Sequence, residues 1–188
     1  VAQTLVNLSK TTGDTAQIEG MDLSKLTAQE LSEEEKLLAE AYDNYIKLFP
    51  NGEKTASYLA NAGALYYQHR QYDMARKYYK TMVTRFPESQ QKSVGLLSLM
   101  NSYFFLGKYL DAEFVAKKII STEGVPVDQV KVAKKRIGES IYKNAERLEQ
   151  EEKFIDAAKE FFRVYTDAPY YKEIVDLALF NSGTVSYT

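Results

Sequence analysis

The stretch that decides the fold is residues 56–87, ASYLANAGALYYQHRQYDMARKYYKTMVTRFP. Its apolar side chains recur every three or four positions in two runs, a period that is typical of amphipathic helices. Arg70 and Gln71 separate the two runs, and Pro87 stops the second because proline cannot continue a helix. The sequence therefore predicts two antiparallel helices joined by a tight turn.

The residues that end the helices and form the turn in this stretch recur along the chain. Phe49-Pro50 and Phe86-Pro87 lie 37 residues apart, and a third helical segment ends at Ala168-Pro169. Each predicted turn is followed by an aromatic residue and, three positions later, by alanine. These alanines lie at intervals of 37 and 45 residues: Ala75, Ala112 and Ala157. A repeat of this length indicates stacked helical hairpins, because each hairpin can bury its apolar face only against a neighbour.

Helical stripes of apolar residues cover most of the rest of the chain, and no alternating pattern typical of a β-strand reaches a useful length. The predicted fold class is therefore all-α. We expect the helical-repeat domain to span residues 33–188, with its last repeat truncated after one helix at 171–186. For residues 1–32 we expect a partial N-terminal helix followed by a loop or disordered insertion, because glycine and polar residues interrupt any period there.

The composition excludes several classes of protein. An apolar fraction of 45% and only 4 prolines are ordinary for a globular chain of 188 residues. The formal net charge is −2 with both signs interspersed, so neither nucleic acid nor an anionic membrane surface is expected as the main partner. No apolar run approaches the roughly 18 residues that a membrane-spanning helix needs.

Nothing in the sequence indicates catalysis. The chain has no cysteine and a single histidine, His69, so it lacks a thiolate nucleophile, a cysteine-based metal site and a histidine with an evident orienting partner. Phosphate-binding loops, zinc-protease motifs, serine-hydrolase elbows and calcium loops are absent as well. We expect no catalytic residue, no metal site and no cofactor, and therefore not an enzyme.

The stretch 56–87 resembles a repeat of the tetratricopeptide (TPR) family, whose units of about 34 residues are helical hairpins. The matching positions are Leu59, Ala62, Gly63, Tyr66, Ala75, Tyr79 and Pro87. A second unit departs from the pattern, with Met100 and Ala116 in place of the glycine and the phenylalanine. A third unit keeps the pattern in its second half, at Ala157, Phe161 and Pro169.

The resemblance implies a right-handed α-solenoid, in which alanine and glycine let helices approach closely and aromatic rings fill the gaps. It also implies a non-catalytic scaffold whose concave groove binds a peptide or a protein domain. On this alignment the groove presents Tyr67, Asn101, Phe104, Phe105, Tyr142 and Tyr187. Core packing between helices is the alternative interpretation of each aromatic residue.

Family features also narrow the expected partner and its location. Some members hold the C-terminus of a chaperone with a clamp of lysine, asparagine and arginine. The corresponding positions here are Ala60, Ala64, Ser98, Glu139 and Lys143, so the clamp is absent and a chaperone C-terminus is not the expected partner. The Phe-Pro pairs and their short polar linkers are similar to repeats of bacterial barrel-assembly lipoproteins and of the periplasmic Tol–Pal coordinator. That similarity implies a multiprotein assembly in the periplasm or cell envelope, and a cytoplasmic location is the alternative.

The sequence also suggests two further interaction surfaces and an alternative function. Five lysines suggest a basic patch for an acidic partner: Lys117, Lys118, Lys131, Lys134 and Lys135. A solvated helix face is the alternative interpretation of these charges. An unpaired helix at 171–186 would leave an apolar edge exposed, so self-association through it is expected. The alternative function is a recruiting or regulatory arm of a larger enzyme whose catalytic domain lies outside this chain.

Overall fold

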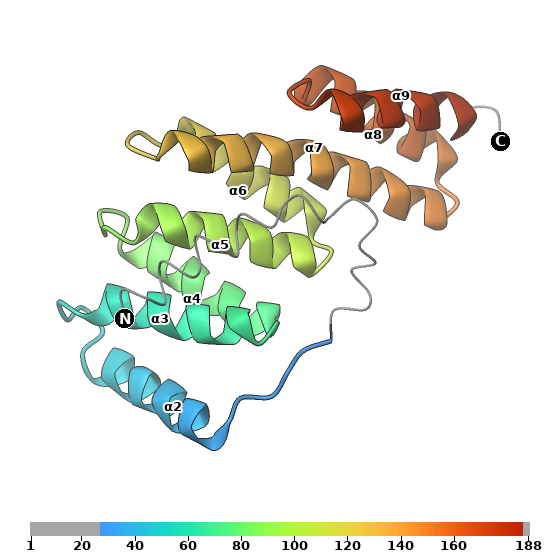
Figure 1. The fold of residues 1–188 in the computed structure, drawn as a ribbon. Helices are drawn as coiled ribbons and strands as arrows, with labels where there is room; N and C mark the ends of the chain where they lie inside the picture. The colour runs from blue at the N-terminus through green and yellow to red at the C-terminus, as the bar shows by residue number, and fades with distance from the viewer. Residues whose placement is uncertain (1–26, 186–188) are drawn as a thin grey trace. The chain divides into compact units, whose positions relative to one another are not determined.

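The computed structural model describes residues 27–185 (Figure 1). All regular structure in these residues is helical, which confirms the predicted all-α class. The helices are α2 (Glu33–Leu48), α3 (Thr55–Gln68), α4 (Tyr72–Arg85), α5 (Lys92–Phe105), α6 (Tyr109–Ser121), α7 (Val127–Gln150), α8 (Phe154–Asp167) and α9 (Lys172–Val185). The predictions for residues 1–26 and for Tyr187 lie outside the described residues.

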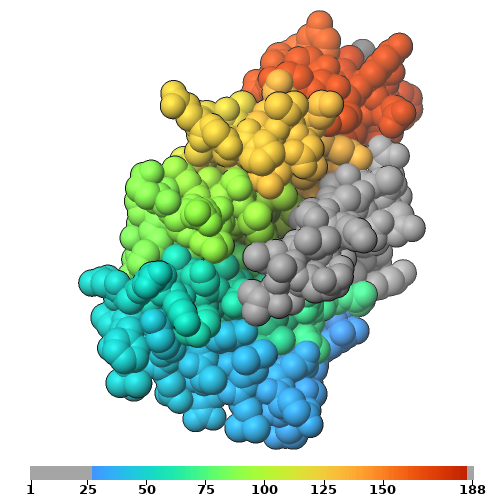
Figure 2. Space-filling model, turned by 60° about the vertical axis from the view of Figure 1, so that its left-hand side comes forward, coloured from blue at the N-terminus to red at the C-terminus, as the bar shows by residue number. Residues whose placement is uncertain are grey.

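The chain divides into two compact units, Val1–Phe105 (unit 1) and Leu106–Thr188 (unit 2). Within unit 1, α2, α3, α4 and α5 pack in a row, each against the next, and within unit 2, α6, α7, α8 and α9 do the same. Alternate helices also meet, α3 with α5 and α7 with α9, so that each unit has two layers. Figure 2 shows the helices of unit 1 in chain order, from the blue of α2 to the green of α5. Consecutive helices packed in a row are the arrangement of a helical-repeat solenoid.

A capping box starts α2. The Ser32 side chain accepts a hydrogen bond from the backbone N–H of Glu35 at 3.2 Å, and the Glu35 carboxylate accepts one from the Ser32 N–H at 2.8 Å. These bonds satisfy two of the backbone N–H groups that a helix start leaves without a partner. The carboxylates of Glu33 and Glu34 in the first turn also favour the positive end of the helix dipole.

The α3–α4 hairpin closes on small residues and one aromatic ring. Ala75 is 0% exposed and Tyr79 is 1% exposed. A Cβ at Gly63 would lie 3.0 Å from two atoms of the Tyr79 ring, so the ring occupies the place that a side chain at this position would need. This geometry confirms the prediction that alanine and glycine let the helices approach while a tyrosine fills the gap.

The same backbone geometry ends three helices ahead of proline. Phe49, Phe86 and Ala168 have φ/ψ angles of −125°/66°, −125°/61° and −137°/51°. Each donates its backbone N–H to the carbonyl four residues earlier. The proline that follows each of them disfavours a helical conformation at the preceding residue. The predicted stops of α2, α4 and α8 are therefore confirmed.

The three predicted turns share a residue in the left-handed conformation. Arg70, Gly107 and Glu152 have φ angles of 57°, 68° and 59°. The residue that follows each of them has a ψ angle of 61°, 64° or 60°. The turn that opens α4, α6 and α8 is thus repeated, although only Gly107 is the residue type that a positive φ favours.

Replacing Glu152 with glycine is expected to raise the free energy of unfolding by about 0.5–1 kcal/mol. Glycine adopts a positive φ without the steric cost of a Cβ, and this gain exceeds the added entropy of the unfolded chain. Gly107→Ala is the matched control and should lower stability by about 1 kcal/mol for the converse reason. Urea unfolding followed by circular dichroism measures both changes, and a less stable Glu152→Gly variant would contradict the repeated turn.

Helix α5 is buried around nearly its whole circumference, contrary to the prediction that it lines an open groove. Every residue from Gly95 to Phe104 is buried. A Cβ at Gly95 would overlap the Met82 Cε atom and lie 3.1 Å from Val83 Cγ1, so glycine lets α5 approach α4 closely. A helix that is apolar on most sides, as α5 is, packs in the interior rather than presenting one face to solvent.

Unit 2 repeats the alternation of small and large residues. Ala112, Ala157 and Phe161 are each 0% exposed. Helix α7 has 24 residues, whereas the helices on either side of it have 13 and 14. The longer α7 accounts for the interval of 45 residues between Ala112 and Ala157, which exceeds the interval of 37 found earlier in the chain.

Candidate functional site

Three aromatic residues of unit 1 converge from three successive helices. Tyr67 lies near the end of α3, Tyr72 is the first residue of α4 and Phe105 is the last residue of α5. The Tyr72 and Phe105 rings stack with centroids 4.8 Å apart, and the Tyr67 ring stands edge-on to Tyr72 at 5.3 Å and to Phe105 at 6.4 Å. We call these three residues the aromatic cluster.

The α3–α4 turn positions two members of the aromatic cluster. Arg70 donates its backbone N–H to the Tyr67 carbonyl at 3.0 Å, and Gln71 donates to the Tyr66 carbonyl at 2.9 Å. These bonds close α3 and bring Tyr72 back against Tyr67. All three rings are partly buried, and burial raises the pKa of the Tyr72 hydroxyl. The cluster is thus a partly buried aromatic surface.

Charged side chains stand beside the aromatic cluster. Arg70 is exposed, and its charge acts on the Tyr72 hydroxyl. Asp73 pairs with Arg76 at 2.6 Å and with Lys77 at 2.9 Å. Hydrogen bonds from Arg76 and Lys77 lower the pKa of Asp73 to about 2. Asp73 is therefore ionised at neutral pH, and this side of unit 1 carries both signs of charge around an apolar centre.

The structure brings together two of the predicted groove residues and corrects two others. Tyr67 and Phe105 belong to the aromatic cluster, as described above. Asn101 is 2% exposed and Phe104 is 0% exposed, so the prediction that both face an open groove is wrong. The physical reason is the burial of α5 on almost every side. Tyr72 is the third member of the cluster, and its position was not predicted from the sequence.

Tyr142 lies in unit 2 and belongs to the packing of three helices. Its hydroxyl accepts a hydrogen bond from the Asn181 side-chain amide at 2.8 Å, and its ring stands edge-on to Phe161 with centroids 5.2 Å apart. Burial raises the pKa of this hydroxyl. Tyr142 therefore joins α7 to α8 and α9, and its binding role stays a prediction.

The five lysines of the predicted basic patch also lie in unit 2. Lys117 pairs with Glu113 at 2.6 Å, and Lys135 lies 3.7 Å from Glu139. Lys134 stands over the Tyr170 ring at 4.9 Å, and Lys135 over the Tyr171 ring at 5.9 Å. Lys118 and Lys131 are exposed. Three of the five cations thus have contacts within the unit, and the patch as a binding site stays a prediction.

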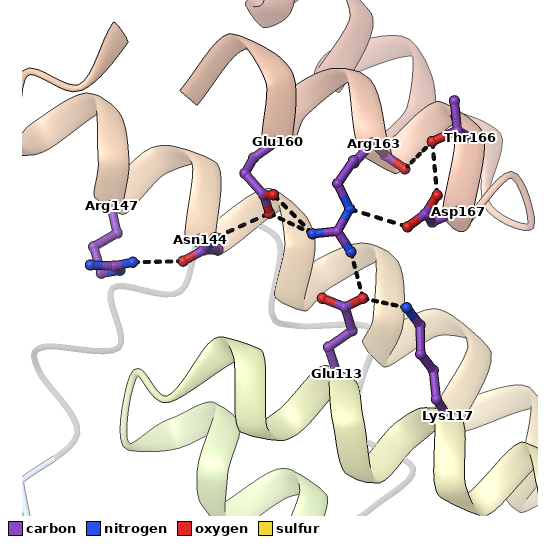
Figure 3. A network of polar contacts seen from close by, with 8 residues as sticks. All are labelled: Glu113, Lys117, Asn144, Arg147, Glu160, Arg163, Thr166 and Asp167. Carbon is purple, nitrogen blue, oxygen red and sulfur yellow. Dashed lines mark hydrogen bonds and ion pairs between the residues drawn. The ribbon is translucent and has the colours of Figure 1, made fainter. Parts of the chain in front are cut away.

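A polar network ties three helices of unit 2 together (Figure 3). The guanidinium of Arg163 on α8 contacts Glu113 on α6 at 2.6 Å and Glu160 at 2.8 Å, and it reaches Asp167 at 3.1 Å. The Asn144 amide on α7 donates to Glu160 at 3.1 Å. Only 8% of the Glu113 side chain is exposed, so its charge depends on these partners. The network is structural, because each member is engaged by another.

His69, the single histidine of the chain, joins α2 to the end of α3. It is the C-cap residue of α3, its Nε2 lies 2.9 Å from Glu35 Oε1, and its carbonyl accepts the backbone N–H of Gln29 at 2.8 Å. Hydrogen bonds from the Ser32 backbone and from the His69 ring lower the pKa of Glu35. His69 therefore contacts the start of α2, and Glu35 is the partner that the sequence did not reveal.

A cavity of about 600 Å³ opens between the first turn of α3 and the α4–α5 connection. Arg85 in its lining donates to the Pro50 carbonyl at 2.6 Å, and Gln91 donates to the Ser57 hydroxyl at 3.3 Å. Because these polar groups hold the connection in place, the cavity indicates no particular ligand.

Within residues 27–185, no three histidine, cysteine or acidic side chains stand where they could hold a metal ion. None of the helices described in this range is long and apolar enough to cross a membrane. No model of a known protein family matches the chain, and no curated protein matches it either. The geometry of the aromatic cluster is therefore the basis for a functional hypothesis.

Proposed function

We propose that this chain is a non-catalytic scaffold of tetratricopeptide-like hairpins that holds another protein through the aromatic cluster. The observation that carries the proposal is the convergence of Tyr67, Tyr72 and Phe105 from three successive helices on one partly buried surface. Aromatic residues dominate the energy of protein interfaces because each buries a large area with few rotatable bonds. The occupant that fits is an extended or helical peptide segment with an apolar anchor residue.

Pre-organisation supports this function. The three rings hold one another, and the turn at Arg70 fixes Tyr72 against Tyr67. A bound segment would therefore order few side chains that were free beforehand, which lowers the entropic cost of association. Arg70, whose side chain is exposed beside Tyr72, offers a cation to the polar residues that flank an apolar anchor.

The proposed setting is a multiprotein assembly in the bacterial periplasm or cell envelope, with the cytoplasm as the alternative. What supports it is the resemblance of the Phe-Pro endings of α2 and α4 to repeats of envelope scaffolds. A repeat fold is shared by proteins of many functions, so the partner has to be identified by experiment.

A photoreactive phenylalanine analogue in place of Phe105 is expected to crosslink the partner in living cells. The same analogue at Phe114, a 70% exposed residue of α6, is the matched control and should give no such adduct. Replacing Phe105 with alanine should weaken binding of the purified partner at least tenfold in a titration, because an interface anchor is worth about 2 kcal/mol or more.

Tyr67→Leu provides a second variant for this test, since Phe105 also contributes to packing in unit 1. Both variants are compared with the original chain at temperatures where circular dichroism shows them folded. The proposal is wrong if the analogue at Phe105 gives no adduct, or if two folded variants bind the partner with unchanged affinity.

A further inference from the structure

The connection between α2 and α3 holds the only asparagine–glycine pair of the chain, Asn51–Gly52. This connection runs through residues 49–54, and the Asn51 side chain is exposed (Figure 1). All other asparagines in the part of the chain that the structure describes lie inside helices: Asn44, Asn61, Asn101, Asn144 and Asn181. Asn51 is therefore the one described asparagine whose backbone is not held by a helix.

An asparagine that precedes glycine can react with its own backbone. The backbone nitrogen of the following residue can attack the side-chain amide carbon, because the product is a five-membered ring. Glycine has no Cβ to hinder that nitrogen, and its backbone adopts unusual conformations at little cost. In a helix the same nitrogen donates its hydrogen to a carbonyl four residues earlier and is held away from the side chain. Residue type and position together single out Asn51.

The reaction needs only water and hydroxide. The Gly52 N–H gives its proton to hydroxide, the nitrogen attacks Asn51 Cγ, and the bond from Cγ to Nδ2 breaks as ammonia leaves with a proton from water. A second water then opens the succinimide ring. Cleavage of the ring bond to Cγ gives aspartate, and cleavage of the ring bond to the main-chain carbonyl carbon gives isoaspartate. Either product makes the formal net charge of −2 more negative by one.

Hydrogen bonds hold this turn in a conformation that engages the attacking group. Gly52 donates its backbone N–H to the Phe49 carbonyl at 3.0 Å. The Thr55 hydroxyl donates to the same carbonyl at 2.5 Å, and Thr55 is 0% exposed. Arg85 of α4 donates to the Pro50 carbonyl at 2.6 Å. Proton loss and attack require that the turn opens, so its local stability limits the rate.

The packing of α2 on α3 lies directly beside the turn. The Tyr45 ring lies 5.0 Å from the Phe49 ring and stands edge-on to the Tyr58 ring at 4.6 Å. A Cβ at Gly52 would lie 3.0 Å from Phe49 Cβ and 3.1 Å from the Tyr45 hydroxyl, so the turn has little space for added atoms. Isoaspartate routes the main chain through the side chain and lengthens it by one carbon atom. The longer chain cannot keep the bond between Gly52 and the Phe49 carbonyl in its present geometry.

We propose that Asn51 is a site of spontaneous modification, at which the chain converts to aspartate and isoaspartate whenever the turn opens. Isoaspartate at this position loosens the end of α2 from α3. Two observations carry the proposal: the exposed Asn51 outside any helix, and the Gly52 N–H held by a turn that must open first. This inference does not depend on the proposed function of the aromatic cluster.

Incubation of the purified 188-residue chain at mildly alkaline pH tests the proposal. Peptide mass spectrometry measures the replacement of the amide NH2 by OH at each asparagine, and isoaspartyl methyltransferase labels isoaspartate. Asn51 is expected to convert roughly tenfold or more faster than Asn44, which is also exposed but lies in α2. Asn181 is a second control, because the small Ser182 follows it in α9. Conversion of Asn51 at the rate of either control overturns the proposal.

Two threonine variants test whether the turn limits the rate. Thr55→Val removes the hydroxyl that holds the Phe49 carbonyl and should speed conversion of Asn51 by roughly threefold or more, because the turn then opens more often. Thr81→Val is the matched control, since the Thr81 hydroxyl donates to the Lys77 carbonyl within α4. Urea that unfolds the original chain should speed conversion as well. Equal rates in the two variants, or a rate that urea leaves unchanged, overturn the gating by the turn.

Asn51→Asp separates the new charge from the longer main chain. This variant carries the charge of the products on an ordinary backbone, and its Tm should stay within about 1 °C of the original. The isoaspartate form, purified from the incubated chain by chromatography, should melt about 2 °C or more below Asn51→Asp. An isoaspartate form with the Tm of Asn51→Asp overturns the loosening of α2.

Discussion

Replacing Tyr79 with alanine is expected to lower the free energy of unfolding by about 3–5 kcal/mol. The ring is 1% exposed and fills the space left by Gly63, a residue that has no side chain with which to close the resulting cavity. Cores are packed as densely as organic crystals, so the neighbouring helices α3 and α4 can relax only in part. Urea unfolding followed by far-ultraviolet circular dichroism measures the change.

Tyr79→Phe is the matched control for the ring without its hydroxyl. Burial raises the pKa of the Tyr79 hydroxyl, which lies near Ser98 and makes no hydrogen bond of good geometry. Removing such a group should change stability by less than about 1 kcal/mol. If Tyr79→Phe were as damaging as Tyr79→Ala, the hydroxyl rather than the filling of space would hold the hairpin.

A double-mutant cycle with Gly63 tests the contact itself. In the original chain Gly63→Ala should cost about 1–3 kcal/mol, because its Cβ would press on the Tyr79 ring. In the Tyr79→Ala background the same change should be neutral or stabilising, since alanine favours the helix and the ring is gone. Additive effects would show that the two residues do not compete for one space.

Much of the fold could be predicted because the residues that end its helices act locally. Proline after Phe49 and Phe86 restricts the preceding residue, and this restriction acts on neighbouring atoms regardless of the rest of the molecule. The turn at Arg70 was predicted from the gap between two apolar runs, although arginine itself gives no sign of a positive φ. The left-handed conformation of the turn could therefore not be predicted from its residue type.

The burial of α5 could not be predicted in the same way. The period of the apolar residues shows that Asn101 and Phe104 lie on a helix. Which sides of that helix are covered depends on helices that are distant in the sequence. Gly95 illustrates the difference, since a Cβ there would press on Met82 and Val83 of α4. In the candidate site, Tyr67 and Phe105 were predicted from the family alignment. Tyr72 was missed because its contacts depend on the path of the turn.

Replacing Arg163 with alanine is expected to destabilise unit 2 by about 2–3 kcal/mol. The change leaves Glu113, with 8% of its side chain exposed, dependent on Lys117, whose own side chain is 52% exposed. Removing one partner of a fully buried pair costs about 3–5 kcal/mol, and the 31% exposure of Arg163 reduces that figure. Lys159→Ala, which breaks an exposed pair with Asp156 on the same helix, is the control and should cost less than about 1 kcal/mol.

The double variant Arg163→Ala/Glu113→Ala should be at least 1 kcal/mol more stable than the sum of the single changes predicts, because it removes the buried charge together with its partner.

The pH dependence of the free energy of unfolding provides a second test of the contacts made by Arg163. Partial burial alone would raise the pKa of Asp167, but the Thr166 hydroxyl and Arg163 outweigh it and lower the pKa. Its lowered pKa contributes stability above about pH 4 that is lost as the pH falls. The stability gap between the original chain and Arg163→Ala should therefore narrow from pH 7 to pH 3, and an unchanged gap would mean that Arg163 acts through packing alone.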